Sequence, residues 1–190
     1  MHLTAELLIP ALWLLYMAYW ALLARTAKGS TQTEKSAERG LRLTVMLAAG
    51  WLLLCNWPHW GNFTRDLLPE ARWRVPLSLV LTLLGLGFSA YARHHLGRNW
   101  SQAVTLKSDH ELITSGPYRW VRHPIYTGLL TALLAVVELE GSPRSLLALA
   151  LICCILLRKL RLEEQWLAAH FGDRYKHYCA HSKALIPFVF

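Results

Sequence analysis

The sequence has only four cysteines among its 190 residues, and their placement excludes a fold held together by disulfides or zinc. Cys55, Cys153 and Cys154 lie inside long apolar runs, and the adjacent Cys153 and Cys154 point in different directions on a helix. Cys179 follows the last apolar run, on a side that we predict below to be cytoplasmic, where thiols stay reduced. Because neither a CxxC pair nor a Cys/His zinc spacing occurs, we expect no structural metal and no metal ligands in the functional site.

The nucleotide-binding signatures of soluble domains are missing as well. The GxG at 85–87 lies inside an apolar run with no strand before it, so it does not fit a dinucleotide fingerprint and instead indicates close helix packing. The net charge of +8 is not gathered on a soluble domain, as nucleic-acid binding would require. We therefore expect no nucleic-acid partner, and we attribute the excess of basic residues to membrane topology and to the attraction of anionic membrane lipids.

Long stretches of the chain lack charge. Residues 3–24 contain one acid, Glu6, and about 20 apolar residues in a helix cross a bilayer core of about 30 Å. This run is too long for a signal peptide and lacks the basic segment that precedes one, so we expect it to stay in the mature protein. The sequence thus predicts an all-α integral membrane protein, a single domain over residues 1–190, with about five transmembrane helices at 3–24, 43–60, 75–92, 124–139 and 143–160.

Basic residues are scarce on one side of these predicted helices, and this asymmetry predicts the topology. Of the twenty lysines and arginines, only Arg65, Arg72, Arg74 and Arg144 fall on the side reached after the second and fourth helices. Basic loops stay in the cytoplasm, so we expect the N-terminus outside and the C-terminus inside. The fourth and fifth helices are separated only by residues 140–142, which predicts a tight helical hairpin.

Two polar regions lie on the predicted cytoplasmic side, at residues 93–123 and 161–190. The first is too polar to cross the membrane, and loops of its length usually have a function. The second begins as an amphipathic helix, for which Gly172 is a stop signal. We expect both regions to contribute to a cofactor site. Of the other loops, we expect 26–42 to be a solvated connector and 56–74 to lie along the outer membrane interface.

The stretch GPYRWVRHPIYTG (116–128) leads into the fourth predicted helix. Pro124 is favoured at a first helical position, and the free N–H groups of a helix start attract carboxylates and phosphates. Arg122 and His123 add further donors there, while Tyr118 and Tyr126 add aromatic faces that suit a purine or a cation. These residues predict a site for a ligand that is part anion, part aromatic base and part cation, although an ordinary basic helix start at the membrane surface also accounts for Pro124.

Two adjacent carboxylates, Glu163 and Glu164, follow the fifth predicted helix and have two interpretations. In the first, they begin an exposed cytoplasmic helix and pair with Lys159, one turn before Glu163, and with Arg161. In the second, Glu163 turns inward and accepts hydrogen bonds from an ammonium or ribose group, while Lys159 holds a substrate anion. The residues alone favour neither interpretation.

Two segments together resemble one enzyme family. HELITSGPYRWVRHPIYTG (110–128) and KLRLEEQWLAAHFGDRYKHY (159–178) are similar to the isoprenylcysteine carboxyl methyltransferase family, whose broader kin are the phospholipid N-methyltransferases. The resemblance covers about residues 80–190. It implies an integral membrane enzyme that uses S-adenosyl-L-methionine without a soluble nucleotide domain. It also implies a cytoplasmic cofactor site built from the loop and the C-terminal segment, and a lipophilic acceptor that arrives through the bilayer.

The resemblance also implies roles for individual residues. Glu163, Glu164 and Arg122 are expected in the catalytic group. Lys159 stands where the eukaryotic enzymes have an arginine that grips the substrate carboxylate, and with Arg161 it is expected to bind substrate, although a lysine lacks the bidentate fork of arginine. A further cofactor contact of the family falls on either Gln102 or Val104 and is not assigned. The cofactor contacts that the resemblance assigns are His110, Glu111, Leu112, Ile113, Tyr118, His123, Pro124, Ile125, Tyr126 and Glu163.

The first functional hypothesis is therefore methyl transfer from S-adenosyl-L-methionine to a lipophilic acceptor, with the carboxylate of an isoprenylcysteine-like substrate favoured. Methylation of a phospholipid amine or of a thiol by the same site stays open. An NADPH-dependent membrane reductase and a non-enzymatic scaffold that recruits anionic lipid are the alternatives from other classes. The enzyme hypothesis requires the start of the fourth helix and the end of the fifth to converge, so that His123 and Glu163 can touch one small molecule.

Overall fold

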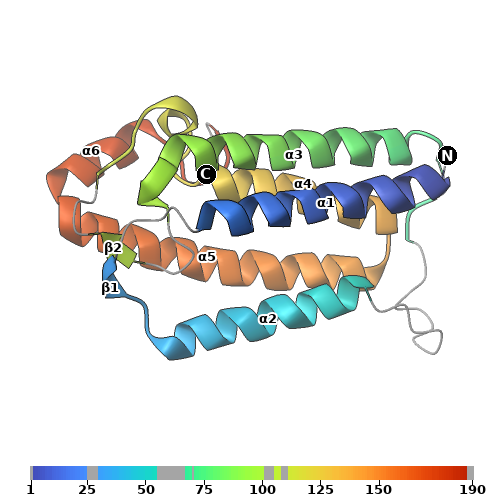
Figure 1. The fold of residues 1–190 in the computed structure, drawn as a ribbon, viewed down its shortest axis with the longest axis horizontal. Coiled ribbons are helices and arrows are strands. Elements are labelled where there is room, and N and C mark those ends of the chain that lie inside the picture. The colour runs from blue at the N-terminus through green and yellow to red at the C-terminus, as the bar shows by residue number, and fades with distance from the viewer. Residues whose placement is uncertain are drawn as a thin grey trace.

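The fold is a bundle of long helices in a computed structural model that describes residues 2–24, 30–54, 67–69, 71–100, 105–107 and 111–187 (Figure 1). Its long helices are α1 (His2–Ala24), α2 (Ser36–Leu54), α3 (Arg74–Leu96), α4 (Pro124–Glu140) and α5 (Pro143–Phe171), followed by the short α6 (Asp173–His181). Two short strands, β1 (Ser30–Thr33) and β2 (Thr105–Lys107), pair antiparallel. Single 3-10 turns lie at Gly97–Asn99 and Gly116–Arg119.

The helices pack in a row, and their direction alternates along the chain, so that the neighbours α1 and α3 run parallel (Figure 1). α1 packs on α3, α3 on α4, α4 on α5, and α5 on α2. Because the direction alternates, the ends of α1, α3 and α5 and the starts of α2 and α4 meet at one end of the bundle, which also holds the two strands and α6 (Figure 1). We call this the polar end. The described parts of both predicted cytoplasmic regions, 93–123 and 161–190, lie there.

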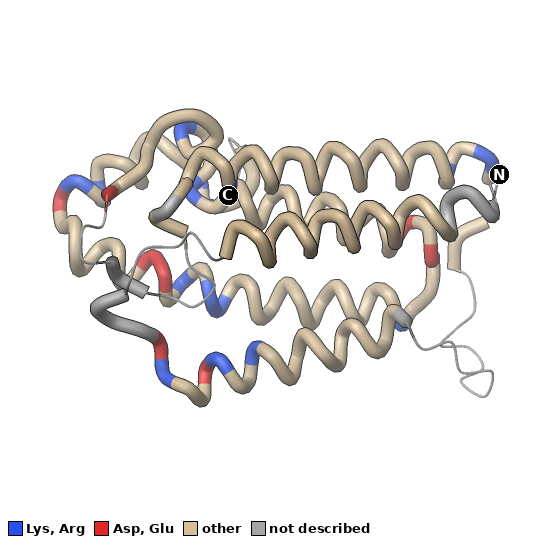
Figure 2. The backbone as a smooth tube through the Cα atoms, viewed as in Figure 1, with Lys and Arg blue, Asp and Glu red and all other residues tan. Residues whose placement is uncertain are grey.

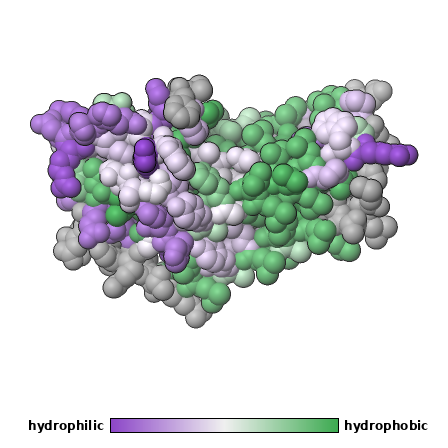
Figure 3. Space-filling view, turned by 90° about the horizontal axis from the view of Figure 1, so that it is seen from above, coloured by the Kyte–Doolittle hydropathy of each residue, from purple (hydrophilic) through white to green (hydrophobic). Residues whose placement is uncertain are grey.

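The surface between the two ends of the bundle is apolar. Charged residues collect toward the ends of the long axis and leave the middle of the helices free of them (Figure 2), and a space-filling view shows a continuous hydrophobic band there (Figure 3). Leu14, Leu15, Leu83 and Leu84 are among the exposed large side chains of this band. Such a band is expected for a protein embedded in lipid. Among the described residues, α1 and α3 are long and apolar enough to cross a membrane, and the number of five spans stays a prediction.

α3 and α4 approach each other closely because glycines face one another between them. A Cβ atom on Gly85 would lie 2.6 Å from the backbone oxygen of Gly128 and 2.6 Å from the backbone nitrogen of Ala132. A Cβ atom on Gly128 would likewise meet the Gly85 backbone. The expectation that the GxG at 85–87 serves helix packing is thus confirmed for Gly85, whereas nothing lies within 4 Å of the position that a Cβ on Gly87 would take.

The fourth and fifth helices form the predicted hairpin. Gly141 ends α4 with a φ of 63° and donates its N–H to the Val137 carbonyl, and the Ser142 side chain accepts the Ser145 N–H at the start of α5. Arg74, at the start of α3, ties this turn down because its Nη2 donates to the carbonyls of Glu138 and Leu139. The hairpin is therefore fixed at the end of the bundle opposite the polar end.

Three segments differ from the sequence-based expectation. The predicted 143–160 helix continues without a break to Phe171, so the amphipathic segment after it is the last part of α5, and Gly172 ends it as predicted. α2 begins at Ser36, inside the expected connector 26–42, because Glu38, Arg39 and Arg42 extend the helix before its apolar run. β1 also lies in that connector, a short sheet that the all-α prediction missed. Most of the expected outer excursion 56–74 lies outside the described residues.

Candidate active site

The start of α4 is held by the C-terminal segment of the chain. The backbone N–H of Arg122 donates to the Lys183 carbonyl at 2.7 Å, and that of His123 donates to the Ala184 carbonyl at 3.0 Å. The Thr127 hydroxyl, one turn into α4, donates to the Leu185 carbonyl at 2.6 Å. The returning chain therefore takes up the N–H of His123, the N-cap residue of α4, and that of Arg122 just before it.

Glu164 is held between two donors of the segment before α4. Arg122 Nε donates to its Oε1 at 2.6 Å, and His123 Nε2 lies 3.3 Å from the same oxygen. The other end of the guanidinium donates from Nη1 to the Ser182 carbonyl at 2.6 Å. Burial raises the pKa of Glu164, but the hydrogen bonds from His123 and Arg122 and their charges outweigh it and lower the pKa from 4.5 to about 2. Glu164 is therefore an anion at every physiological pH.

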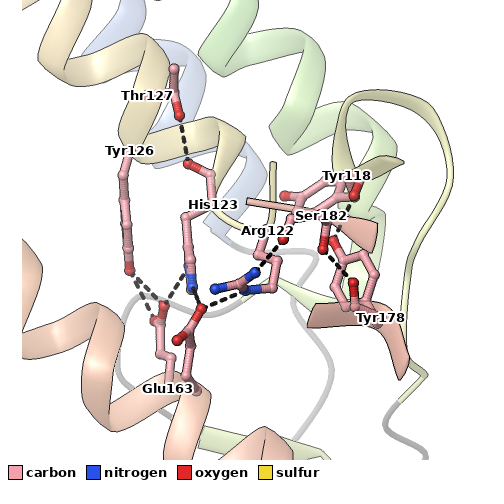
Figure 4. Close-up of polar contacts among 9 residues, drawn as sticks. Tyr118, Arg122, His123, Tyr126, Thr127, Glu163, Tyr178 and Ser182 are labelled. Carbon is pink, nitrogen blue, oxygen red and sulfur yellow. Dashed lines mark hydrogen bonds and ion pairs between the residues drawn. The ribbon is translucent and has the colours of Figure 1, made fainter. Parts of the chain in front are cut away.

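Glu163 lies one residue earlier on α5 and faces the first turn of α4 (Figure 4). The Tyr126 hydroxyl lies 2.9 Å from both of its carboxylate oxygens. Lys159 Nζ lies 3.6 Å from Oε1, and His123 Nδ1 lies 3.6 Å from Oε2. The predicted convergence of the α4 start and the α5 end is thus confirmed. Of the two interpretations of these carboxylates, the inward one fits, since both are only about one quarter exposed.

Aromatic rings line the same place. The rings of His123 and Tyr126 stack with centroids 5.4 Å apart and planes 2° apart, and Lys159 Nζ lies 5.4 Å from the centre of the Tyr126 ring. Both rings are buried, and they stand side by side above Glu163 (Figure 4). We call Arg122, His123, Tyr126, Lys159, Glu163 and Glu164 the Glu163 cluster.

Tyr118 is buried beside the end of α3 and connects the loop before α4 to the rest of the polar end. Its hydroxyl donates to the Ala92 carbonyl at 3.4 Å, and its own carbonyl accepts the Tyr178 hydroxyl at 2.6 Å. The ring stacks on His95, whose Nε2 lies 2.9 Å from the Ser115 hydroxyl. Burial raises the pKa of Tyr118, so its hydroxyl stays protonated and acts as a donor. Tyr118 therefore supports the loop that leads to His123.

The remaining expected cofactor residues take different positions. His110 lies outside the described residues. Glu111 is exposed, whereas Leu112 and Ile113 are partly buried and Ile113 packs against the core. Among the described residues, the backbone of 111–114 makes no backbone hydrogen bond that holds it in a helix or strand, so its N–H and C=O groups can serve a ligand. Pro124 and Ile125 are buried in the first turn of α4, next to the cluster.

Arg161 is not brought to the Glu163 cluster. Its side chain is exposed to the surroundings of the bundle. The reason is helical geometry: Lys159 and Glu163 are four residues apart and share a face of α5, whereas Arg161 lies between them in sequence and points elsewhere. In the described part of the chain, no group of three or more His, Cys, Asp and Glu side chains could hold a metal ion.

Two charged residues near the cluster, Glu34 and Arg42, were not predicted from the sequence. Glu34, two residues before α2, has a fully buried side chain. Arg42 donates from Nη1 and Nη2 to its two carboxylate oxygens, the Nη1 bond at 2.8 Å. The hydrogen bonds to Glu34 raise the pKa of Arg42. α2 packs on α5, and Met46, one turn after Arg42, packs against the core cluster that contains Tyr126, so Arg42 lies on the side of α2 that faces the site. The signal that was available is the helical spacing of Glu38, Arg39 and Arg42, which extends α2 into the expected connector.

The donor set of the cluster fits a ligand that combines a cation, hydroxyls and an aromatic base. Carboxylates accept hydrogen bonds from ammonium and ribose groups, and stacked aromatic faces attract a sulfonium or ammonium cation. The backbone N–H and C=O groups at 111–113, which bond to no backbone group in the described part of the chain, match the edge of an adenine. S-adenosyl-L-methionine carries all of these groups, so the side chains present fit it.

Comparisons with known proteins agree with this geometry. Residues 78–169 match the isoprenylcysteine carboxyl methyltransferase (ICMT) family. A probable protein-S-isoprenylcysteine O-methyltransferase of Oryza sativa subsp. indica is 26% identical over 153 residues, which are 77% of this chain and 80% of the relative. The protein-S-isoprenylcysteine O-methyltransferase of Schizosaccharomyces pombe is 32% identical over 115 residues, 59% of this chain and 49% of that relative.

A solved structure is similar in fold. It is the eukaryotic intramembrane Ras methyltransferase ICMT without a monobody, with a TM-score of 0.54 and 22% sequence identity, and the likeness covers 82% of this chain and 54% of that one. This chain thus spans about half the length of that structure and of the Schizosaccharomyces relative. The residues that match the model of the isoprenylcysteine carboxyl methyltransferase family, 78–169, include nearly all of α3, α4 and α5.

Proposed function

We propose that the protein is an integral membrane methyltransferase that uses S-adenosyl-L-methionine and acts on a lipophilic acceptor, the carboxylate of an isoprenylcysteine-like substrate. The observation that carries the proposal is the position of Glu163, which lies 3.6 Å from His123 and within hydrogen-bond distance of the Tyr126 hydroxyl. The two family-like segments, 110–128 and 159–178, meet there although they are distant in sequence. The names of the relatives from Oryza and Schizosaccharomyces contain protein-S-isoprenylcysteine O-methyltransferase, which supports an isoprenylcysteine carboxylate as the acceptor.

The donor would lie against the start of α4. Glu163 and the stacked rings of His123 and Tyr126 would hold the cationic part of S-adenosyl-L-methionine, and the backbone of Glu111–Ile113 would hold its adenine. Tyr118, Pro124 and Ile125 would shape the surrounding wall, because all three are buried beside these residues. When bound, S-adenosyl-L-methionine supplies an electrophilic methyl group on a sulfonium, so the chain mainly has to orient the acceptor and exclude water.

The acceptor would lie on the lipid side of the cluster, with its anion near Lys159. A carboxylate is ionised at neutral pH, so its methylation requires no general base from the chain. Glu164 binds Arg122 and His123 at the same time, so Arg122 and Glu164 act by holding His123 in place. Arg161, expected from the resemblance to assist Lys159, is exposed and has no part in this proposal.

Methylation of an amine is less well supported than methylation of a carboxylate. A neutral amine forms only when an ammonium loses a proton, and a base suited to this task has a pKa near the working pH. Glu164 has a pKa lowered to about 2, which makes it a weak base. The NADPH reductase and the lipid-recruiting scaffold have no specific support, because neither accounts for the inward-facing carboxylates beside a stacked aromatic pair.

We further propose five membrane spans with the N-terminus outside and the polar end in the cytoplasm. The excess of lysines and arginines in the segments of the polar end supports this orientation. A cytoplasmic polar end also gives the cluster access to a water-soluble donor, while the apolar band brings a lipophilic acceptor to its edge through the bilayer (Figure 3). Membrane lipids are then the natural surroundings of the acceptor.

The test is titration of the purified protein with S-adenosylhomocysteine. We expect the intact protein to bind it, Tyr126→Ala to bind it about tenfold more weakly, and Glu163→Ala to lose more, because a carboxylate that accepts charge-assisted hydrogen bonds is worth about 1.5–3 kcal/mol. Asp173→Ala is the matched control, since this carboxylate is exposed on α6. A failure of the intact protein to bind the probe would contradict the proposal, as would equal affinities of all three variants.

A further inference from the structure

The segment 30–42 is tied to the polar end of the bundle and is not a free connector. β1 pairs with β2, with Thr33 opposite Thr105, and this pairing fixes the backbone just before Glu34. In the first turn of α2, Glu38 accepts from Arg158 Nη2 at 3.1 and 3.2 Å, and Arg158 directly precedes Lys159 on α5. The strand pairing thus fixes this segment at the polar end, and the Glu38–Arg158 pair holds it against the end of α5 that carries the Glu163 cluster.

Arg42 is aimed at the polar end by its place on α2. Helical side chains lean toward the N-terminus of their helix, so the guanidinium of Arg42 lies beyond its own Cα, at the level of Glu34. The bidentate bond to Glu34 holds it there. Met46, one turn further along the same face, packs on the core cluster that contains Tyr126 and Leu160. The face of α2 that carries Arg42 is thus the face turned toward the Glu163 cluster.

Around Glu34 and Glu163, three cations face two carboxylates, so the charges do not cancel. Glu34 is matched by Arg42, and Arg39 Nε approaches the same carboxylate at 4.0 Å. Glu163 is matched by Lys159. The hydrogen bonds to Glu34 raise the pKa of Arg42, so its guanidinium stays charged. Partly buried charges act on one another at an effective dielectric far below that of water, so a guanidinium at this position affects what binds beside Glu163.

We propose that Arg42, held by Glu34, is a specificity-determining residue whose positive charge favours an anionic acceptor beside Glu163. The inference rests on the proposed function and adds a residue to it from outside the segments that resemble the family. Arginine at this place complements Lys159, which offers a single ammonium and no planar fork. Glu34 acts as a positioning residue, since it fixes the guanidinium and also offsets part of its charge.

The test compares two lipophilic probes that differ only in charge: an amine-blocked S-farnesylcysteine carboxylate and the matching carboxamide. The measured quantity is the ratio of their affinities in the presence of S-adenosylhomocysteine. We expect Arg42→Gln to lower the preference for the carboxylate about tenfold, which corresponds to about 1.4 kcal/mol. We expect Glu34→Gln to raise the preference about threefold, because the amide still accepts a hydrogen bond from Arg42 but no longer offsets its charge.

The two substitutions are expected to change the affinity ratio in opposite directions, which distinguishes a charge effect of Arg42 from a purely structural role. If the Glu34–Arg42 pair only held α2 in place, breaking it from either side would change the two probes alike. Lys176→Gln is the control, because Lys176 is an exposed cation of the polar end that pairs with Asp173, and we expect it to leave the ratio unchanged. Equal shifts in Arg42→Gln and Glu34→Gln, or a tenfold loss in Lys176→Gln, would overturn the inference.

A variant that does not fold leaves the test intact. Removing Arg42 takes the bidentate partner away from the buried Glu34 carboxylate, which is costly, whereas Glu34→Gln keeps Arg42 as a hydrogen-bond donor. If Arg42→Gln cannot be purified, the rise in Glu34→Gln decides the question, and no rise refutes the role of Arg42. Binding of S-adenosylhomocysteine by the unaltered protein is measured alongside, since its absence refutes the proposed function and not the charge effect.

Discussion

At the scale of single residues, the two adjacent glutamates of α5 have different partners. Glu164 is bound by Arg122 and His123, which lie in the segment before α4. Glu163 is bound by Tyr126 from the first turn of α4 and by Lys159 from α5 itself. Adjacent residues on a helix differ in direction by about 100°, so each carboxylate reaches its own set of donors. Glu164 therefore stabilises the site, and Glu163 is left with the face that a ligand can approach.

We expect the stability contributed by Glu164 to depend on pH. Its pKa in the folded protein is lowered to about 2, so the contribution is present above the unfolded pKa of about 4.5 and is lost as the pH falls toward 2. Glu164→Gln should lower the free energy of unfolding by about 2 kcal/mol at pH 7, a value reduced for the partial exposure of the carboxylate. The difference from the unaltered protein should shrink toward pH 3.

Thermal unfolding in detergent at both pH values measures this difference. Asp173→Asn is the control, because its ion pair with Lys176 is almost fully exposed and should contribute little at either pH. A Glu164→Gln protein that is as stable as the unaltered one at pH 7 would show that Arg122 and His123 do not depend on this carboxylate.

At the scale of secondary-structure elements, the site depends on how closely α3 and α4 pack. Glycine at positions 85 and 128 allows their backbones to touch, and fully buried Ser89 lies at the same contact. This contact sets the position of α4 relative to the end of α3, where Tyr118 donates to the Ala92 carbonyl. Small residues at helix contacts have the same role in membranes generally.

We expect Gly85→Ala to destabilise the protein by about 1–3 kcal/mol or more, because the added methyl would meet backbone atoms at 2.6 Å that cannot move alone. Gly87→Ala is a matched control two residues away on the same helix, where a Cβ meets nothing within 4 Å and alanine favours the helix. Thermal unfolding followed by tryptophan fluorescence compares the two. Equal melting temperatures of the two variants would contradict the close backbone contact between α3 and α4 at Gly85.

Several elements of the site could be predicted from local patterns, and others could not. Pro124 at a helix start, Gly172 at a helix end and the 140–142 turn follow from capping preferences, which act over a few residues. The pairing of Arg122 and His123 with Lys183 and Ala184 joins segments about sixty residues apart. No local preference encodes such a contact, so it becomes visible only when the chain has folded.

At the scale of the whole molecule, the charge distribution gives the bundle two unlike ends. The polar end carries the Glu163 cluster and the short strands, and the opposite end carries the α4–α5 turn tied to Arg74 (Figure 2). Basic residues near membrane spans favour the cytoplasmic side, and the polar end holds most of them. The orientation in the membrane is thus a property of the chain as a whole.

We expect Asp173→Cys to react with a membrane-impermeant maleimide from the cytoplasmic side only, and Arg72→Cys from the opposite side only. Both positions are exposed and described, one at each end of the bundle. The four native cysteines are first replaced by alanine so that each variant carries one thiol. Labelling in right-side-out and inside-out membrane vesicles gives the two orientations, and the reverse pattern would refute the proposed topology.

The sequence by itself determined the apolar helices, the helix start at Pro124, the helix stop at Gly172, and the presence of carboxylates, basic residues and aromatics near two helix ends, because periodicity, capping and hydropathy act locally. Only the tertiary structure decided that Glu163 faces Tyr126 and His123, that the C-terminal segment binds the start of α4, and that Arg42 pairs with a buried Glu34. These decisions depend on which helices become neighbours. Which helices pack together depends on close contacts such as that of Gly85 with Gly128, whose two residues lie far apart along the chain.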